Sequence, residues 1–549
     1  MNSLKPMLLS SLKSYDKSQL VKDVTAGIIV AIIALPLSIA LALASGVGPE
    51  AGIFTAIVAG FVISALGGSS VQIAGPTAAF ATIVAGIVAH DGMDGLIVAT
   101  ILAGIFLILM GLCHFGSLIK FIPFTITTGF TSGIAVTIVI GQLKDFFGLT
   151  YPTGVKPIET VEKFEAVINN FSTINMDAVI VGVVSLAILI IAPYIFKRIP
   201  GSLLAVIAGI LMVQFLPLKV NTIGNLYTIS NALPTLHFPS LSLKMIQNAL
   251  PNALTIAVLA AIESLLSCVV ADGMINGKHR SDTELVAQGA GNIASALFGG
   301  IPATGAIART AANIKNGGRT PIAGMVHSIT LVIVLVVLMP YAGMIPMPTI
   351  AAILFIVAYN MCQWRTFVNL VKTAPKSDVI VLVTSFVLTV IFDLVVAIEV
   401  GMVLACLLFI KRMSEETKVN GWTYVDDDTL DVDEHLQKLP LQIRVYEISG
   451  PLFFGAASVI EEIAVKDFTT CLVLRMRSVP ALDSTALNAL KDLVQVCESK
   501  GITIVFSHVN DQPMKVMEKA GFIELVGKEN FQSSISAALD RAEEIIHSK

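Results

Sequence analysis

The sequence predicts a polytopic α-helical membrane protein of fourteen spans, followed by a small cytosolic α/β domain. Apolar residues make up 55% of its 549 residues and charged residues only 13%, whereas soluble domains are about half apolar and a quarter charged. Half of the 35 Lys and Arg and 39 Asp and Glu lie in residues 411–549, so the polar domain begins near Lys411. A helix start made of small residues also occurs twice, far apart, within apolar segments.

Apolar runs define the predicted spans, because a transmembrane helix needs about 20 apolar residues and a broken helix needs fewer. Seven spans in each half favour an inverted repeat, in which the short third and tenth spans occupy corresponding positions. The predicted spans are residues 22–44, 50–66, 76–90, 94–114, 119–141, 176–195, 202–216, 251–272, 284–300, 305–316, 322–340, 347–360, 376–393 and 394–411.

The two repeated helix starts are residues 75–78 (Gly-Pro-Thr-Ala) and residues 302–306 (Pro-Ala-Thr-Gly-Ala). An unpaired backbone amide is costly in hydrocarbon, so a helix begins in mid-membrane only where it faces protein or a water-filled cavity. Two facing starts would direct the positive ends of two helix dipoles at one pocket, which would attract anions. An ordinary kink in each helix is the alternative.

The predicted domains are a cytosolic N-terminal segment (1–21), a transmembrane transport domain (22–411), a linker (412–436) and the α/β domain (437–549). Both termini are expected to be cytoplasmic, because cytoplasmic loops carry an excess of Lys and Arg. The basic residues that set this orientation are Lys5, Lys13, Lys17, Lys22, Lys197, Arg198, Lys411 and Arg412.

The C-terminal segment alternates apolar strands with helical patterns, which is typical of an α/β domain. Strands are predicted at 441–454, 471–476 and 502–509, and helices at 484–498, 514–519 and 533–546. Asp483 and Ser484 stand where a strand gives way to a helix, so either side chain can cap that helix. The functional alternative is a regulatory turn that is phosphorylated or binds a partner.

Several function classes are disfavoured by the sequence. The six cysteines have no metal-ligand spacing, and the net charge of −4 gives no reason to expect nucleic-acid binding. No set of nucleophile, base and oxyanion hole and no Walker-type glycine loop is present, so we expect no enzyme activity. No cofactor is expected apart from a coupling ion, Na⁺ or H⁺.

Glu263 is the strongest candidate for ion coupling, because it lies in the middle of an apolar span. Ionisable groups in such positions are costly and are functional candidates by default. Ser267 follows four residues later on the same helix face and could supply a second oxygen. The alternative is a protonated structural glutamate that is hydrogen-bonded to a neighbouring helix.

The chain resembles the sulfate permease family of anion transporters over nearly its whole length. The resemblance rests on Asp23 to Gly27, Pro36, Gly48-Pro49, Gly67 to Ser69, Gly75-Pro76, Asp272 to Met274, Gly277 to Ser281, Glu284-Leu285 and Ala287 to Asn292. The tail resembles that family's STAS domain, with Leu482 to Thr485 at its signature turn. This resemblance implies core and gate domains arranged as in nucleobase transporters, commonly in homodimers, in a bacterial plasma membrane.

The resemblance also implies where the anion binds, namely at the two helix starts. The residues that it assigns to this site are Thr77, Ala78, Thr304, Gly305, Ala306 and Arg309. Hydroxyl and backbone donors can bind a small anion without burying a fixed charge pair. Arg309 would add positive potential from one turn behind the pocket, unless it extends its side chain to the interface. In the family, the position of Glu263 resembles a carboxylate coupled to sodium in some bacterial members and to protons in others.

Leu37 and Leu41 depart from the family pattern, in which many members carry Gln and an aromatic residue. A more apolar pocket wall disfavours sulfate, which needs many donors, and favours bicarbonate or a C4-dicarboxylate. We therefore expect a secondary active transporter of such an anion, coupled to H⁺ or Na⁺ and working by alternating access. A transporter or exchanger of sulfate or another inorganic anion, an anion channel, and a scaffold that recruits a cytosolic enzyme through its tail are the alternatives.

The remaining charged residues near span ends are expected to be structural. Asp393 and Glu399 stand at a helix junction within reach of water. Asp272, His279 and Arg280 mark a cytoplasmic or interfacial loop and are expected to cap helices and stabilise the core.

Overall fold

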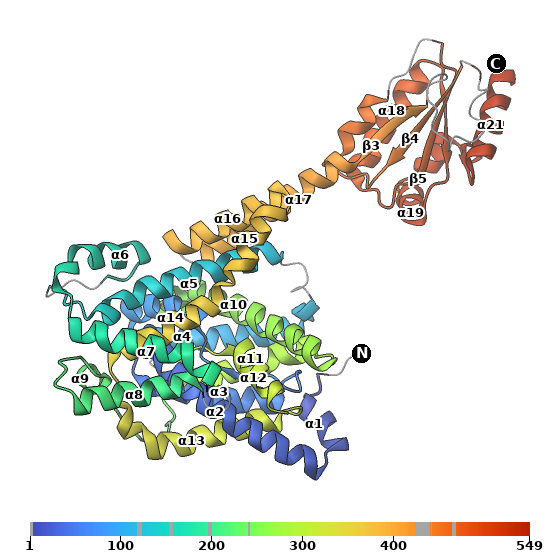
Figure 1. The fold of residues 1–549 in the computed structure, drawn as a ribbon. Helices are drawn as coiled ribbons and strands as arrows, with labels where there is room; N and C mark the ends of the chain where they lie inside the picture. The colour runs from blue at the N-terminus through green and yellow to red at the C-terminus, as the bar shows by residue number, and fades with distance from the viewer. Residues whose placement is uncertain are drawn as a thin grey trace. The chain divides into compact units, whose positions relative to one another are not determined.

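The computed structural model describes residues 4–117, 123–152, 157–195, 200–239, 242–392, 394–422, 440, 442–463 and 468–548 (Figure 1). The chain divides into two compact units, residues Met1–Met402 and Val403–Lys549. The first unit is helical apart from two short strands, and the second is an α/β domain. Asp393, which was expected to be structural, lies outside the described residues.

The helical unit follows the predicted order of spans. Its elements are α1 (Met7–Ser11), η1 (Leu12–Ser14), α2 (Lys17–Ala44), α3 (Pro49–Leu66), β1 (Ala74–Gly75), α4 (Ala78–Leu112), α5 (Phe124–Phe147), α6 (Thr160–Asn169), η3 (Phe171–Thr173), α7 (Met176–Ile195), α8 (Gly201–Phe215), α9 (Ile223–Leu226), α10 (Leu243–Ile275), α11 (Ser281–Leu297), β2 (Thr304–Gly305), α12 (Ile307–Lys315), α13 (Ile322–Ala342), α14 (Met347–Cys362), α15 (Trp364–Thr373), α16 (Lys376–Ile391) and α17 (Leu394–Glu416).

Every predicted span coincides with a helix, although the count of fourteen spans stays a prediction. Among the described residues, eight helices are long and apolar enough to cross a membrane. The predicted third and fourth spans form one 35-residue element, α4, which is interrupted at Gly92, where φ is 69°. A straight helix of that length would exceed the roughly 30 Å hydrocarbon core. Glycine allows the interruption because it adopts positive φ without a steric penalty.

Short helices outside the predicted spans mark the two ends of this unit. Figure 1 shows α6 and α9 at the opposite end of the helical unit from α1. Because α1 lies within the basic N-terminal segment, the predicted orientation assigns α6 and α9 to the outside. Periodicity of apolar residues did not predict α6 or α15, since both are only ten residues long.

The second unit contains a five-stranded sheet in the order β3-β4-β5-β6-β7. Only the β3–β4 pair is antiparallel, and the other three pairs are parallel. Its elements after α17 are β3 (Lys418–Trp422), β4 (Ile443–Ser449), η5 (Ala457–Glu462), β5 (Cys471–Ser478), α18 (Ser484–Ser499), β6 (Thr503–Ser507), α19 (Asp511–Lys519), α20 (Phe522–Val526), η6 (Lys528–Asn530), β7 (Phe531–Gln532) and α21 (Ile535–Ser548).

Helices cover both faces of this sheet. Side chains of α18, α19 and α20 pack with one face in a core that includes Leu490, Met517 and Phe522. Side chains of α21, among them Ala538 and Ala542, pack against the other face. Alternate residues of each strand point to opposite faces, so the strands read as apolar on both sides.

The sheet begins inside the segment that was predicted to be a linker. Strand β3 falls within residues 412–436 and pairs with all of Val445–Ser449 in β4. This strand contains Asn, Gly and Lys and shows no clear apolar alternation, so its pairing with β4, rather than its own pattern, makes it a strand. The stretch 412–436 is therefore not a linker throughout.

We predict that a fragment starting at residue 414 is more stable than one starting at residue 437. Without β3, strand β4 becomes an exposed edge, and Val419 no longer packs against the core. The free energy of unfolding should fall by about 2 kcal/mol, the burial energy of one valine. Urea denaturation of both fragments measures this difference, and equal unfolding free energies would contradict it.

Candidate functional site

The two predicted helix starts lie side by side. Strand β1, which precedes α4, pairs antiparallel with β2, which precedes α12, so that Ala74 faces Gly305 and Gly75 faces Thr304. The Ala306 amide also donates to the Ile73 carbonyl at 2.9 Å. The backbone groups of β1 and β2 therefore pair with each other, so they have hydrogen-bond partners without water.

Neither start has a side-chain cap. Thr77 is the N-cap residue of α4 and Ala306 is that of α12, and neither side chain accepts a hydrogen bond from its own helix. First-turn amides of a helix have no partner within the helix, so uncapped starts present donors and positive potential to a ligand. The start of α12 is not enclosed by protein, because its first residue, Ile307, is 43% exposed.

Close packing explains the glycines at the paired strands. A Cβ at Gly75 would collide with Nη1 of Arg309, and one at Gly305 would collide with the side chain of Gln72. A side chain at either position would therefore displace Arg309 or Gln72, and neither glycine has a positive φ. The same contacts bring Arg309 and Gln72 against the strands.

Consecutive residues of α10 contact the two starts. The Thr77 hydroxyl donates to Oε2 of Glu263 at 2.9 Å, and Oγ of Ser264 lies 2.6 Å from Oγ1 of Thr304. Ser264 also accepts from the Gly305 amide at 3.2 Å. The candidate coupling carboxylate is therefore hydrogen-bonded to a residue of the predicted anion site.

Ser264 takes a place in this site that the sequence analysis did not assign. Ser267, which was predicted to supply a second oxygen beside Glu263, is buried, and its Oγ has no hydrogen-bond partner among the described residues. The available signal for Ser264 was its hydroxyl next to Glu263 in an apolar span. The four-residue spacing favoured Ser267 because it selects residues on the same face of α10 as Glu263, and Ser264 lies on a neighbouring face.

Arg309 is buried behind the paired strands, with only 3% of its surface exposed. Its Nη2 donates to Oγ of Ser38 and to the carbonyl of Pro76, both at 3.3 Å. Arg309 therefore does not extend to the interface, which removes that alternative. Its charge lies within one helical turn of the α12 start.

Leu37 and Leu41 on α2 lie on either side of Ser38 in the sequence. Leu41 is 4% exposed, and Leu37 is half-buried. Ser38, and not either leucine, forms the hydrogen bond to Arg309. The sequence comparison drew attention to the two apolar side chains and overlooked the hydroxyl between them.

Helix α11 fixes the loop before β1. Oε2 of Glu284 accepts from the amides of Gly68 and Ser69 at 2.8 and 3.1 Å. Its Oε1 accepts from the side-chain amides of Gln72 and Gln288 at 2.7 and 2.8 Å. Four donors thus surround one fully buried carboxylate, as a buried charge requires.

The same helix fixes the loop before β2. The side chain of Asn292 donates to the Ala303 carbonyl at 2.9 Å and accepts from the Ala303 amide at 2.8 Å. Asn292 lies two turns after Glu284, so one face of α11 fixes both loops. These residues had been noted only as carriers of the family resemblance.

The loop between α10 and α11 is held by the residues that were expected to be structural. Oδ2 of Asp272 lies 2.7 Å from Nδ1 of His279 and accepts from the His279 amide at 2.9 Å. The guanidinium of Arg280 donates to the Lys5 carbonyl at 2.6 Å and to Oγ of Ser10 at 2.9 Å. Arg280 therefore attaches the N-terminal segment to this loop.

The predicted regulatory turn of the tail is formed by Asp483 and Ser484. Oδ1 of Asp483 accepts from the Ala486 amide at 2.9 Å, and Oδ2 accepts from the Phe454 amide at 2.8 Å. Asp483 is therefore the cap of α18, and Ser484 is the first helical residue, with its side chain exposed.

Glu399, the other residue expected to be structural, is exposed on α17.

Comparison with known proteins identifies two families along the chain. The model of the sulfate permease family matches residues 20–385, and that of the STAS domain matches residues 438–538. YvdB of Bacillus subtilis is 38% identical over 94% of this chain and 97% of that protein. The bicarbonate transporter BicA of Picosynechococcus is 31% identical over 95% of this chain and 94% of that protein.

The solved structures confirm the fold. The murine Solute Carrier 26 family member A9 anion transporter, solved in its inward-facing state, superposes with a TM-score of 0.87. It covers 98% of this chain and 94% of the murine chain at 19% identity. The helical membrane core with a C-terminal STAS domain is therefore the fold that both chains share.

We predict that Gly75→Ala lowers anion affinity roughly tenfold, the equivalent of about 1.4 kcal/mol. The added methyl group would displace the Arg309 guanidinium, which lies behind the paired strands and supplies positive potential to the start of α12. Gly141→Ala on α5 is the matched control, because a Cβ there meets nothing within 4 Å. The half-saturation concentration for anion uptake is measured for both variants. Normal affinity in Gly75→Ala would contradict the predicted role of the β1–β2 pair.

Proposed function

Because this chain belongs to the sulfate permease family, we propose that it is a secondary active transporter of bicarbonate or a C4-dicarboxylate. The observation that carries this proposal is the β1–β2 pair, which joins two uncapped helix starts next to Glu263. Amides at helix starts and hydroxyl groups bind anions. A carboxylate beside them provides a group whose protonation or sodium binding can change with anion binding.

The apolar pocket wall favours a carboxylate anion. Leu37 and Leu41 supply no donor on α2. The hydroxyls of Thr77 and Thr304 already bond to Glu263 and to the Ala260 carbonyl, so the donors proposed for the anion are the backbone amides of the two helix starts. Sulfate presents four acceptor oxygens on one centre and needs many donors around it, whereas a carboxylate group has two oxygens and needs fewer. The resemblance to BicA, which is named a bicarbonate transporter, supports bicarbonate. Transport or exchange of sulfate or another inorganic anion remains the alternative that the family description supports.

Coupling to H⁺ or Na⁺ is proposed to act through Glu263. The hydrogen bond from Thr77 connects this carboxylate to the start of α4, where the anion is proposed to bind. A cation or proton at Glu263 would offset the negative charge that the anion brings into a low-dielectric environment. Anion and coupling ion would then favour each other's binding, which is the linkage that symport requires.

The setting of the transporter is part of the proposal. We place it in a bacterial plasma membrane as a homodimer with both termini in the cytoplasm, where the STAS domain can contact a cytosolic protein. The basic residues at the span ends support this orientation. Alternating access would move the helices that carry the anion site against the remaining ones.

Purified protein in proteoliposomes tests the proposal directly. Uptake of radiolabelled bicarbonate, succinate, fumarate and sulfate is measured under an inward Na⁺ gradient, an inward H⁺ gradient and no gradient. We expect saturable accumulation of bicarbonate or a dicarboxylate under one of the gradients. Unsaturable currents that follow the electrical potential would favour an anion channel, and absence of movement for all four anions would contradict the proposal.

We predict that Glu263→Gln abolishes accumulation driven by a gradient and leaves the protein folded. The amide keeps the shape of the side chain, but it can neither take up a proton nor balance the charge of a sodium ion. Glu399→Gln is the matched control, because Glu399 is an exposed glutamate on α17. Accumulation in Glu263→Gln at the level of the unmodified protein would exclude a coupling role.

We predict that a change at Ser484 affects regulation of transport, whereas a change at Asp483 affects the stability of the domain. Ser484→Glu should change the transport rate or the proteins that copurify with the chain, because negative charge is favoured at the start of α18. Asp483→Ala should instead lower the free energy of unfolding by about 1 kcal/mol through loss of the cap. Transport rates, copurified proteins and melting temperatures of both variants provide the test. An unchanged rate and unchanged partners in Ser484→Glu would leave this turn without a regulatory role.

A further inference from the structure

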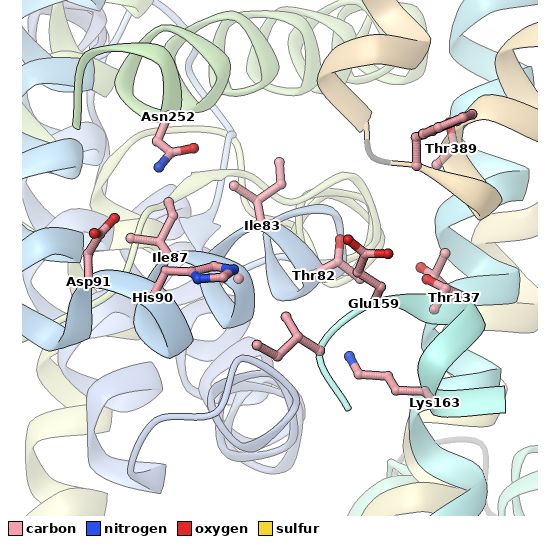
Figure 2. A pocket seen from close by; sticks show the side chains of 14 residues that line it. Thr82, Ile83, Ile87, His90, Asp91, Thr137, Glu159, Lys163, Asn252 and Thr389 are labelled. Atoms are coloured by element: carbon pink, nitrogen blue, oxygen red, sulfur yellow. The ribbon is translucent and has the colours of Figure 1, made fainter. Parts of the chain in front are cut away.

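A polar cavity of about 260 Å³ lies between helices α4, α5, α6, α10 and α16 (Figure 2). Its lining combines hydroxyl and amide groups with a few charged side chains. The polar lining residues are Thr82, His90, Asp91, Thr137, Glu159, Thr160, Lys163, Asn252 and Thr389. Nothing in the sequence analysis had assigned this cavity a role.

The cavity lies on the same helix that begins at the predicted anion site. Thr82, Gly86 and His90 line the cavity and follow Ala78 at intervals of four residues along α4. Residues four apart lie above one another on one helix face. Thr82 therefore lies one turn beyond the anion site on nearly the same side of α4, whereas His90, three such steps from Ala78, is turned about 120° away from it.

Lys163 of α6 provides a positive charge in this cavity without a paired carboxylate. Its side chain is half-buried, and Figure 2 shows its amine directed into the cavity. Among the described residues, no carboxylate oxygen is within the 4 Å of an ion pair with it. Burial lowers the pKa of Lys163, while the charge of Glu162 opposes this change. A bound anion would offset the cost of desolvating this ammonium group.

Within the described part of the chain, the acidic groups of the lining, Glu159 and Asp91, form no ion pair with Lys163. Glu159 and Glu162 form the capping box at the start of α6, and Glu162 accepts from the amide of Ile158 at 2.9 Å. In Figure 2 Asp91 lies on the opposite side of the cavity from Lys163. His90, Thr82 and Asn252 add donors to the lining, and in Figure 2 Asn252 lies across the cavity from Lys163.

We propose that this cavity is an outer anion-binding site, in which Lys163 holds the substrate before it moves along α4 to the paired helix starts. The proposal rests on the transport function proposed above and on the orientation that places α6 outside. The ligand is a small anion that accepts hydrogen bonds, such as bicarbonate or a carboxylate. A positive group in a cleft raises the local concentration of anions and their rate of association.

The test compares transport from the two sides of the membrane. Right-side-out and inside-out vesicles containing the full chain are supplied with radiolabelled bicarbonate, succinate or sulfate. Lys163→Gln should raise the half-saturation concentration roughly tenfold for anion supplied from outside and leave it unchanged for anion supplied from inside. Lys163→Glu should raise this outside half-saturation concentration further. Lys163→Arg, which keeps the positive charge, should leave it at the value of the unmodified protein. The maximal rate should change little in all three variants.

Lys144→Gln is the matched control, because Lys144 is an exposed lysine near the end of α5 that lies over the ring of Tyr151. Its half-saturation concentration should equal that of the unmodified protein on both sides. An unchanged outside value in Lys163→Gln and Lys163→Glu, or an equal increase on both sides, would overturn the outer site. If the unmodified protein moves none of the three anions, the transport function itself fails, which is a different result.

Discussion

The antiparallel pairing of Ala74–Gly75 with Thr304–Gly305 is the contact on which the proposed anion site depends. Each segment interrupts a helix within the membrane, and by itself each would leave backbone groups unsatisfied in hydrocarbon. Their mutual hydrogen bonds remove that cost and fix the starts of α4 and α12 next to each other. Residues more than 200 positions apart thus form one site, because neither segment can satisfy its backbone alone.

A buried polar network keeps this pair in place. Glu284 and Asn292 on α11 bind the loops that precede the two strands, while Arg309 bridges Ser38 of α2 and the carbonyl of Pro76. Such networks are stable only when nearly every group has a partner, and they then specify one arrangement. The uncapped amides of the two helix starts are not used for this fixation and remain available for a ligand, whereas the Thr77 hydroxyl donates to Glu263.

Thr82, one turn after Ala78 on α4, is the first polar side chain between the paired strands and the cavity around Lys163. The cavity is bounded by α4 and α10 on one side and by α5, α6 and α16 on the other, as Figure 2 shows for the labelled residues. Alternating access needs a polar route that opens between two groups of helices. The hydroxyl and amide groups here would keep an anion partly hydrated along that route, which lowers the cost of its desolvation.

The sequence by itself determined the helical membrane unit, the α/β tail and the two helix starts, because apolar run length, charge distribution and small-residue motifs are local properties. It also singled out Glu263, since an isolated charge in an apolar span is conspicuous, whereas Arg309 was assigned through the family resemblance. Only the tertiary structure decided that Ser264 and Ser38 contact the site and that the Ser267 hydroxyl has no hydrogen-bond partner among the described residues. It likewise made β3 a strand and brought Lys163 to α4. These outcomes depend on which helix faces and strands meet, and spacing along one element does not contain that information.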